Sequence, residues 1–253
     1  MSVWPNGSTT ECPHEWDRDM LILGIESATS QVGCAVGGHE GVLASVQSAR
    51  HRRHAESLVP QIDFARRQAA IELSDLGVIA VDVGPGLYTG LRVGVTTAMT
   101  MAHFLRVPMV GVSSLDLVAF PLRFSDRQIH VALDARRGEV FHARYRSVPG
   151  GVQRVTEPMV ATPVEMASDI VAEGEEVLLV GDGALRHRSE FDGLSRIEFA
   201  DRGFAHPSAA SLVELAHARA LREEFVRPDQ IAPIYLRRPD AEARWEPAGG
   251  VAG

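Results

Sequence analysis

The sequence predicts an α/β protein built from two lobes, each made of strands followed by helices. Strand-like apolar runs and helix-like segments alternate twice along the chain, first from Met20 and again from Ile129. At 253 residues the chain is long enough to bury a substantial core. No linker rich in Pro, Gly and Ser separates the halves, so we expect the two lobes to pack against each other.

We place four regions along the chain: a flexible N-terminal extension at 1–19, lobes at 20–125 and 126–238, and a flexible tail at 239–253. The extension lacks the apolar core of a signal peptide. No window of the chain approaches ~18 consecutive apolar residues, so we expect no membrane span. Two cysteines, Cys12 and Cys34, fit a reducing compartment. These observations predict a cytoplasmic protein.

The first lobe is expected to open with strands. Residues 21–25 form an apolar run, and 32–36 and 42–46 read as a β-hairpin around a glycine-rich loop. An amphipathic helix follows, since apolar residues recur with the helical period at Leu58, Ile62, Ala65 and Ala69, with Pro60 inside it. Ser113 and Asp116 then have the spacing of a capping box that opens another helix after a strand at 109–112.

The second lobe repeats this order. Segments 129–134 and 140–145 are predicted to form a β-hairpin. Thr162 to Glu165 has the pattern of a capped helix start with a proline at the first helical position. A buried-type strand at 177–180 and a helix at about 208–224 follow.

The most informative segment runs from a strand at 78–83 through a Gly-Pro-Gly turn to a helix predicted to begin near Leu91. Up to Leu105 this helix carries only Arg92 and His103 as charged or titratable groups. A surface helix normally has a polar face, so a helix that is apolar or small nearly all round is predicted to be buried on more than one side. In a domain of this size the second side often belongs to another subunit, which favours a binding role.

A helical wheel divides this helix into two faces. One face is expected to pack against the sheet of this chain: Leu91, Gly94, Val95, Ala98, Ala102 and Leu105. The opposite face is our predicted partner interface, together with Phe64 of the preceding helix: Val93, Thr96, Thr97, Thr100 and Phe104. Small threonines allow a second helix to approach to about 8–10 Å. The alternative is that an internal loop covers this face.

The glycine turn does not match the common nucleotide-binding loops. A phosphate loop needs a Gly-Lys pair, and the chain has none. The dinucleotide fingerprint needs a third small residue where Thr89 stands, and Gly90 comes one residue late. We therefore interpret the turn as a connection between strand and helix and expect no cofactor.

The net charge of −8 argues against a protein that binds nucleic acid by itself, because Lys and Arg supply most of the non-specific affinity for phosphates. Local basic clusters occur at 50–54, at Arg66 and Arg67, and at Arg136 and Arg137. We interpret them as solvated faces and loop tips, or as parts of an RNA path that a more basic partner completes.

An ordered set of motifs resembles the TsaB (YeaZ) family over residues 20–238: Gly24-Ile-Glu-Ser27, His54-Ala-Glu-Ser-Leu-Val-Pro60, Gly84-Pro-Gly-Leu-Tyr-Thr-Gly-Leu-Arg-Val-Gly94, Gly111-Val-Ser-Ser-Leu115, Asp134-Ala-Arg136, Gly138-Glu-Val140, Gly181-Asp-Gly183 and Pro233-Ile-Tyr-Leu-Arg237. Departures are modest: Glu26 replaces an aspartate, and Leu87 and Tyr88 stand where Ser and Phe are usual. The resemblance implies a two-lobed α/β fold of the actin, Hsp70 and sugar-kinase type (the ASKHA fold).

The resemblance also implies a function. The chain would be the non-catalytic partner of a TsaD-like paralogue that makes threonylcarbamoyladenosine next to the tRNA anticodon. A TsaE-like ATPase would be a second partner, tRNA would be contacted only within the complex, and the isolated chain could form a homodimer. No catalytic, cofactor or metal residue is assigned on this interpretation.

Two enzymatic alternatives remain open at this point. An ASKHA-type ATP-dependent phosphotransferase would use Glu26 and Asp134 as its metal and base carboxylates. A metallopeptidase-like protein would need the two metal-binding histidines of the catalytic paralogue, but Ser114 and Val118 occupy those positions here. His51 and His54 are three residues apart in a basic stretch and are interpreted as surface residues.

Overall fold

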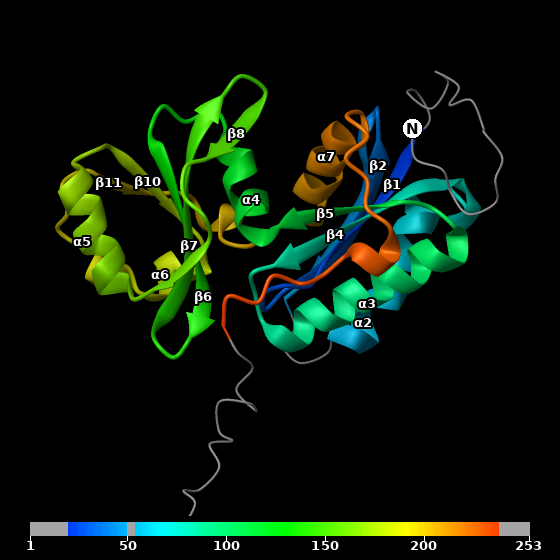
Figure 1. The fold of residues 1–253 in the computed structure, drawn as a ribbon, viewed down its shortest axis with the longest axis horizontal. Coiled ribbons are helices and arrows are strands. Elements are labelled where there is room, and N and C mark those ends of the chain that lie inside the picture. Colours follow the sequence, from blue (N-terminus) through cyan, green and yellow to red (C-terminus); the bar gives the residue numbers. More distant parts are fainter. Residues whose placement is uncertain (1–19, 50–53, 238–253) are drawn as a thin grey trace, which may run out of the picture.

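The computed structural model describes residues 20–49 and 54–237, and in it two α/β lobes lie side by side (Figure 1). The predicted extension at 1–19, the tail at 239–253 and the basic residues 50–53 lie outside the described residues. The predicted two-lobed α/β fold is confirmed. No helix of the described residues is both long and apolar enough to cross a membrane.

The first lobe contains a five-stranded sheet in the order β3-β2-β1-β4-β5. Its strands are β1 (Leu21–Glu26), β2 (Val32–Gly38), β3 (Gly41–Ser48), β4 (Leu76–Gly84) and β5 (Met109–Ser113). β1 pairs antiparallel with β2 and parallel with β4, and β4 pairs parallel with β5. Two helices, α2 (His54–Gln68) and α3 (Tyr88–Leu105), cover one face, and α7 (Ala209–Ala220) covers the other (Figure 1).

The second sheet repeats this arrangement in the order β11-β10-β6-β7-β8, with β9 paired to β7. Its strands are β6 (Gln128–Arg136), β7 (Glu139–Val148), β8 (Gly151–Arg154), β9 (Met159–Ala161), β10 (Val177–Val180) and β11 (Ile197–Phe199). β6 is antiparallel to β7 and parallel to β10. It thus takes the place that β1 has in the first sheet, between an antiparallel and a parallel neighbour. The repeated strand-and-helix organisation predicted from the sequence is thus present.

The other helices complete the two lobes. They are α4 (Ser114–Ala119), α5 (Pro163–Glu173) and α6 (Asp182–Arg186), with short 3₁₀ turns η1 (Leu73–Asp75), η2 (Phe120–Leu122), η3 (Arg188–Glu190), η4 (Arg202–Phe204) and η5 (Pro228–Gln230). α4 packs on one face of the second sheet, and α5 and α6 pack on the other.

The inner face of α3 packs as predicted, with Leu91, Gly94, Val95, Ala98 and Ala102 buried and Leu105 partly buried. A side chain at Gly94 would overlap the hydroxyl of Ser27, which is buried at the end of β1 and donates to the Gly90 carbonyl at 2.8 Å. The glycine therefore lets α3 lie directly against the end of the sheet.

One predicted helix start and one predicted cap need correction. α3 begins at Tyr88 rather than near Leu91, because Leu91 N donates to Leu87 O at 3.0 Å and closes a turn through Thr89 and Gly90. Their low helix propensity hides this turn in the sequence. No side chain caps the helix that follows Ser113, so the predicted capping box at Ser113 and Asp116 is absent.

Asp116 has other partners instead. Its carboxylate accepts from Tyr145 Oη on β7 at 2.9 Å, from Arg154 on β8 at 2.6 Å, and lies 3.4 Å from Arg219 on α7. The capping box at Thr162 and Glu165 does form, with reciprocal bonds of 3.2 and 2.8 Å.

The C-terminal part of the chain returns to the first lobe. α7 comes from residues expected in the second lobe, 126–238, but it packs on the first sheet, and it ends before 224 because Glu223 has a left-handed φ of 57°. The C-terminal segment, which we define as residues 226–237, then bridges Met109 and bonds to Val83. It ends at the second lobe, where Arg237 donates to Ala135 O at 3.1 Å (Figure 1).

Gly86→Ala tests the close contact between the glycine turn and the end of β1. A Cβ at Gly86 would overlap the carbonyl oxygen of Ala28 and lie 2.8 Å from its Cβ. Because backbone must shift, we expect a loss of about 1–3 kcal/mol of unfolding free energy in urea. Gly151→Ala is the matched control, since a methyl group at Gly151 would have nothing within 4 Å. Equal unfolding midpoints for both variants would contradict this packing.

Candidate functional site

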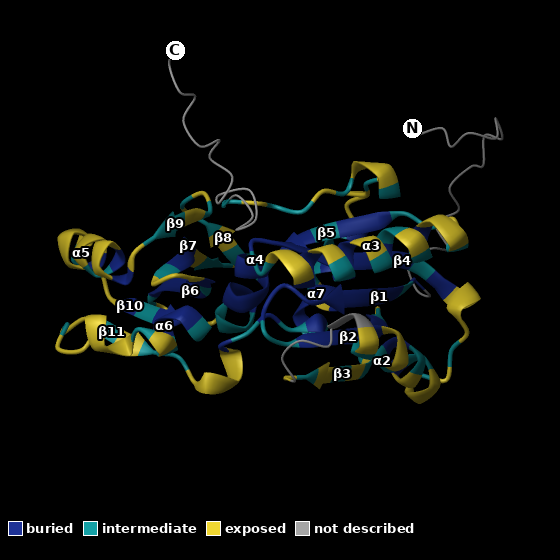
Figure 2. Ribbon diagram, turned by 90° about the horizontal axis from the view of Figure 1, so that it is seen from below, coloured by how far each residue is buried: buried dark blue, intermediate teal, exposed yellow. Residues whose placement is uncertain are grey.

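The predicted partner interface lies on the outer surface of the first lobe. α2 and α3 pack side by side, and Figure 2 shows exposed residues along both helices. Phe104 is 82% exposed and Phe64 53% exposed. Thr96 and Thr100 are exposed, whereas Val93 and Thr97 are partly buried. No internal loop of the described residues covers Phe104 or Thr100, so that alternative is wrong for this part of the chain.

The Thr100 hydroxyl at the centre of this face is bonded within the helix. Its Oγ1 donates to Thr96 O at 2.8 Å, as expected for a threonine whose hydroxyl is bonded locally. Two large aromatic side chains on the same two helices remain in contact with water. Exposed apolar surface of this kind marks interaction sites in globular proteins.

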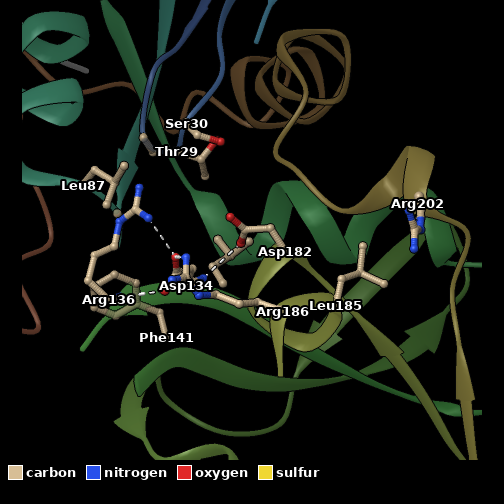
Figure 3. A pocket seen from close by; sticks show the side chains of 13 residues that line it. Thr29, Ser30, Leu87, Asp134, Arg136, Phe141, Asp182, Leu185, Arg186 and Arg202 are labelled. Atoms are coloured by element: carbon tan, nitrogen blue, oxygen red, sulfur yellow. Dashed lines mark hydrogen bonds and ion pairs between the residues drawn. The ribbon is translucent and has the colours of Figure 1, made fainter. Parts of the chain in front are cut away.

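A cleft of about 400 Å³ lies between the lobes (Figure 3). Residues of the first lobe line one side: Ala28, Thr29, Ser30, Gly86 and Leu87. Residues of the second lobe line the other: Leu133, Asp134, Arg136, Phe141, Asp182, Leu185, Arg186 and Arg202. Both lobes therefore contribute polar groups to one concave surface.

Asp134 is held by two arginines on the floor of this cleft. Its Oδ2 lies 3.1 Å from Arg136 and 3.0 Å from Arg186, and only 8% of its side chain is exposed (Figure 3). Its backbone N–H donates to Asp182 Oδ1 at 3.0 Å, and burial raises the pKa of the Asp182 carboxyl. Both oxygens of Asp134 thus already accept hydrogen bonds within the chain, from Arg136 and Arg186.

Glu26 and Asp82 form a buried acidic pair at the carboxyl ends of β1 and β4. Glu26 is fully buried and accepts from Ala28 N at 2.8 Å. Burial first, and the neighbouring Asp82 second, raise the pKa of Glu26 well above its usual value. Burial raises the pKa of Asp82 to about 7, against hydrogen bonds from Ser114 Oγ at 2.6 Å and Gly84 N at 2.7 Å.

The structure does not bring Glu26 and Asp134 into one site. Asp134 lines the cleft, but Glu26 is not among the residues that line it. At the positions of the paralogue's metal-binding histidines, Ser114 is bonded to Asp82 and Val118 is 1% exposed in the core under the second sheet. In the described residues no group of three or more His, Cys, Asp or Glu could hold a metal ion. His51 and the side chain of His54 lie outside the described residues.

Sequence reasoning missed the arginines that converge on the cleft. Arg186 and Arg202 belong to no motif that we singled out, although Asp182 stands in Gly181-Asp-Gly183 and Arg136 in Asp134-Ala-Arg136. Those two motifs were the sequence features that could have indicated the cleft. They lie close together in space only because β6 pairs in parallel with β10, which the sequence does not reveal.

Three comparisons place the chain among known proteins. Residues 41–245 match the family model described as TsaD: tRNA N6-adenosine threonylcarbamoyltransferase. The chain is 29% identical to the "tRNA threonylcarbamoyladenosine biosynthesis protein TsaB" of Bacillus subtilis, over 89% of this chain and 98% of that protein. It is 33% identical to an uncharacterised Mycobacterium leprae protein over 88% of this chain, and spans 56% of that relative's length.

A solved structure shares the fold. It is a Pseudomonas aeruginosa protein described as similar to the peptidase YeaZ, with a TM-score of 0.75 and 25% sequence identity. The match covers 86% of this chain and 100% of that chain.

Asp82→Asn tests the buried acidic pair through pH. The pKa of Asp82 is about 7 in the folded protein against 3.8 for the usual group, so its contribution to stability is full below about pH 4 and is lost as the pH rises through 7. Asn carries no titratable group, so the unfolding free energy of the variant should fall less than that of the wild type when the pH rises from 5 to 8. The difference between the two decreases should be a few kcal/mol, since one pKa unit is about 1.4 kcal/mol. The control is Asp169→Asn, at an exposed position, which should leave the pH dependence of the wild type unchanged. An unchanged pH dependence in Asp82→Asn would refute the burial of this charge.

Proposed function

The chain belongs to the TsaB (YeaZ) family, and from this membership we propose that it is the non-catalytic partner subunit of a TsaD-like enzyme. In that complex, threonylcarbamoyl is transferred to the adenosine next to the tRNA anticodon. Participation in threonylcarbamoyladenosine biosynthesis is supported by the family model and by the TsaB name of the Bacillus relative.

One observation carries the non-catalytic part of the proposal. The model of the transferase family extends over most of the chain, yet the two metal-ligand positions of the catalytic paralogue hold Ser114 and Val118. Valine has no donor atom, and its side chain is packed in the core. The Ser114 hydroxyl already donates to Asp82. At the positions where the paralogue would bind a metal, this chain therefore has one side chain packed in the core and one hydrogen-bonded to a buried carboxyl group.

The exposed face of α2 and α3 supports docking as the activity that remains. Val93, Thr96, Thr97, Thr100, Phe104 and Phe64 are the residues that we propose for the contact with the TsaD-like subunit. The exposed rings of Phe64 and Phe104 would supply the apolar anchors, and the threonines would let a partner helix approach closely. The same face would pair two copies of the chain when the partner is absent. A TsaE-like ATPase would join the assembly, and tRNA would bind only to the complex.

The cleft between the lobes is the observation that favours the second candidate, an ATP-dependent phosphotransferase. Against it, Asp134 is neutralised by two arginines and Glu26 is buried away from the cleft. The peptidase named for the Pseudomonas structure would need a nucleophile or metal site, and the described residues hold no candidate metal group.

Thr100→Arg tests the docking face. It would place an unpaired charge in the middle of the contact, and desolvating such a charge costs several kcal/mol. We expect loss of binding to the TsaD-like partner, measured by isothermal titration calorimetry, with little change in thermal stability.

Ser168→Arg on α5 is the matched control for this substitution. Ser168 is exposed and its hydroxyl donates to Val164 O at 2.9 Å, just as Thr100 donates to Thr96. It should bind the partner at wild-type strength. A folded Thr100→Arg protein with unchanged affinity would refute the proposed interface.

A reconstituted reaction separates a docking subunit from an enzyme. With TsaD-like and TsaE-like proteins, ATP, threonylcarbamoyl-adenylate and tRNA, omission of this chain should abolish the modified nucleoside detected by mass spectrometry. Glu26→Gln should leave the yield unchanged, since the buried carboxyl takes no part in the chemistry. Modification without the chain would refute the proposal, and ATP turnover by the isolated chain that Glu26→Gln abolishes would favour the phosphotransferase.

A further inference from the structure

An aromatic cluster on the first lobe has no part in the proposed docking. Tyr88 begins α3, and Tyr235 of the C-terminal segment packs on it with ring centroids 5.2 Å apart and a tilt of 38°. The Arg92 guanidinium lies 5.2 Å from the Tyr88 ring centroid and donates to Tyr88 Oη at 2.7 Å. Tyr88 is 38% and Tyr235 45% exposed, so parts of both side chains remain open to solvent.

A cluster of arginines lies on the adjoining part of the second lobe. Arg136, the last residue of β6, and Arg137, in the turn to β7, have φ values of 65° and 55°. Residues other than glycine rarely adopt this left-handed conformation, and such residues gather at functional sites. Asp134 orients Arg136 and Arg186. The cleft is lined by three arginines, the third being Arg202, and by two aspartates, Asp134 and Asp182, which leaves a net positive charge. This excess stands out in a chain of net charge −8.

Two connections hold the aromatic cluster beside the arginines. Leu87, which precedes Tyr88, lines the same cleft as Arg136 and Arg186 (Figure 3). Arg237, two residues after Tyr235, donates to Ala135 O and forms a 3.0 Å ion pair with Glu139, so the C-terminal segment is bonded to both strands of the arginine-bearing hairpin. Two residues span at most about 7 Å. The tyrosines therefore flank the arginine-lined cleft through Leu87 and Arg237, and we treat the rings and the cleft arginines together as one surface.

We infer that this surface binds a single-stranded segment of RNA. Unpaired bases would stack on Tyr88 and Tyr235, with Arg92 adding a cation–π contact, and phosphates would bind at Arg136 and Arg186. Aromatic rings beside a basic groove are the combination that recognises unpaired nucleotides. This assignment rests on the proposed function, which concerns the adenosine next to the tRNA anticodon. The single-stranded segment that we assign to this surface is therefore the anticodon loop of the tRNA. The overall negative charge explains why a more basic partner must supply the remaining affinity.

The test measures RNA affinity of the complex between this chain and its TsaD-like partner. The probe is a fluorescein-labelled anticodon stem–loop whose loop reads a codon beginning with A, titrated by fluorescence anisotropy at several salt concentrations. Tyr235→Ala should weaken binding about tenfold without changing the salt dependence, because it removes the stacking of one base and no phosphate contact. Tyr235→Phe keeps the ring and should bind within about twofold of the wild type.

Arg186→Ala should weaken binding and reduce the slope of log K against log salt by about 0.7, the value for one phosphate contact on a single strand. Arg146→Ala is its matched control. Each of these two arginine side chains is 58% exposed and ion-paired to a carboxylate at about 3 Å, but Arg146 pairs with Glu175 away from the cleft. Arg92→Gln is a second variant of the aromatic cluster. It leaves the C-terminal segment unchanged, so it still tests stacking if Tyr235→Ala detaches that segment from α3.

The outcomes separate this inference from the proposed function. A complex that forms and modifies tRNA, but binds the probe equally well with Tyr235→Ala, Arg92→Gln and Arg186→Ala, overturns the RNA surface and leaves the docking role standing. Loss of partner affinity in these variants, with RNA affinity intact, assigns the surface to a protein and also overturns it. If the chain does not bind the TsaD-like protein, the docking role fails, and the chain alone is titrated at low salt, where phosphate contacts are strongest. Weak binding that falls in the variants then supports the inference, and no response to the variants overturns it.

Discussion

The Asp116 carboxylate holds the two lobes in register. It lies on α4, at the point where the chain passes from the first sheet to the second, and accepts hydrogen bonds from Tyr145 on β7 and Arg154 on β8. Arg219 on α7 reaches the same carboxylate and also donates to Gly111 O on β5 at 2.6 Å. One partly buried anion thus ties elements of both sheets together. The network therefore links the two lobes whose residues line the cleft.

Polar groups near the carboxyl ends of the strands are engaged by contacts within this chain. Glu26 is buried, Asp134 is paired with two arginines, and Ser114 is bonded to Asp82. The exposed rings of Phe64 and Phe104 lie on α2 and α3, and neither residue lines the cleft. This distribution is why we assign the function to surfaces that other molecules contact.

Local patterns predicted the parts of the fold that depend on neighbouring residues. The hairpins at β2–β3 and β6–β7, the capping box at Thr162 and the buried face of α3 follow from alternation, capping spacing and helical periodicity. Long-range contacts decided the rest. Asp116 leaves its expected cap because two arginines from distant segments reach it, and α7 covers the first sheet because Gly24 and Gly37 leave room for Val213. The same reason hid Arg186 and Arg202 from sequence reasoning.

Hydrogen–deuterium exchange of the chain, with and without the TsaD-like partner, tests most directly whether the protein acts by docking. We predict slower exchange in the complex along α2 and α3, at residues 54–68 and 88–105, and unchanged exchange in α5 at 163–173. Protection confined to α5 or to the strands of the second sheet, with α3 exchanging as in the free chain, would contradict a docking role for this face.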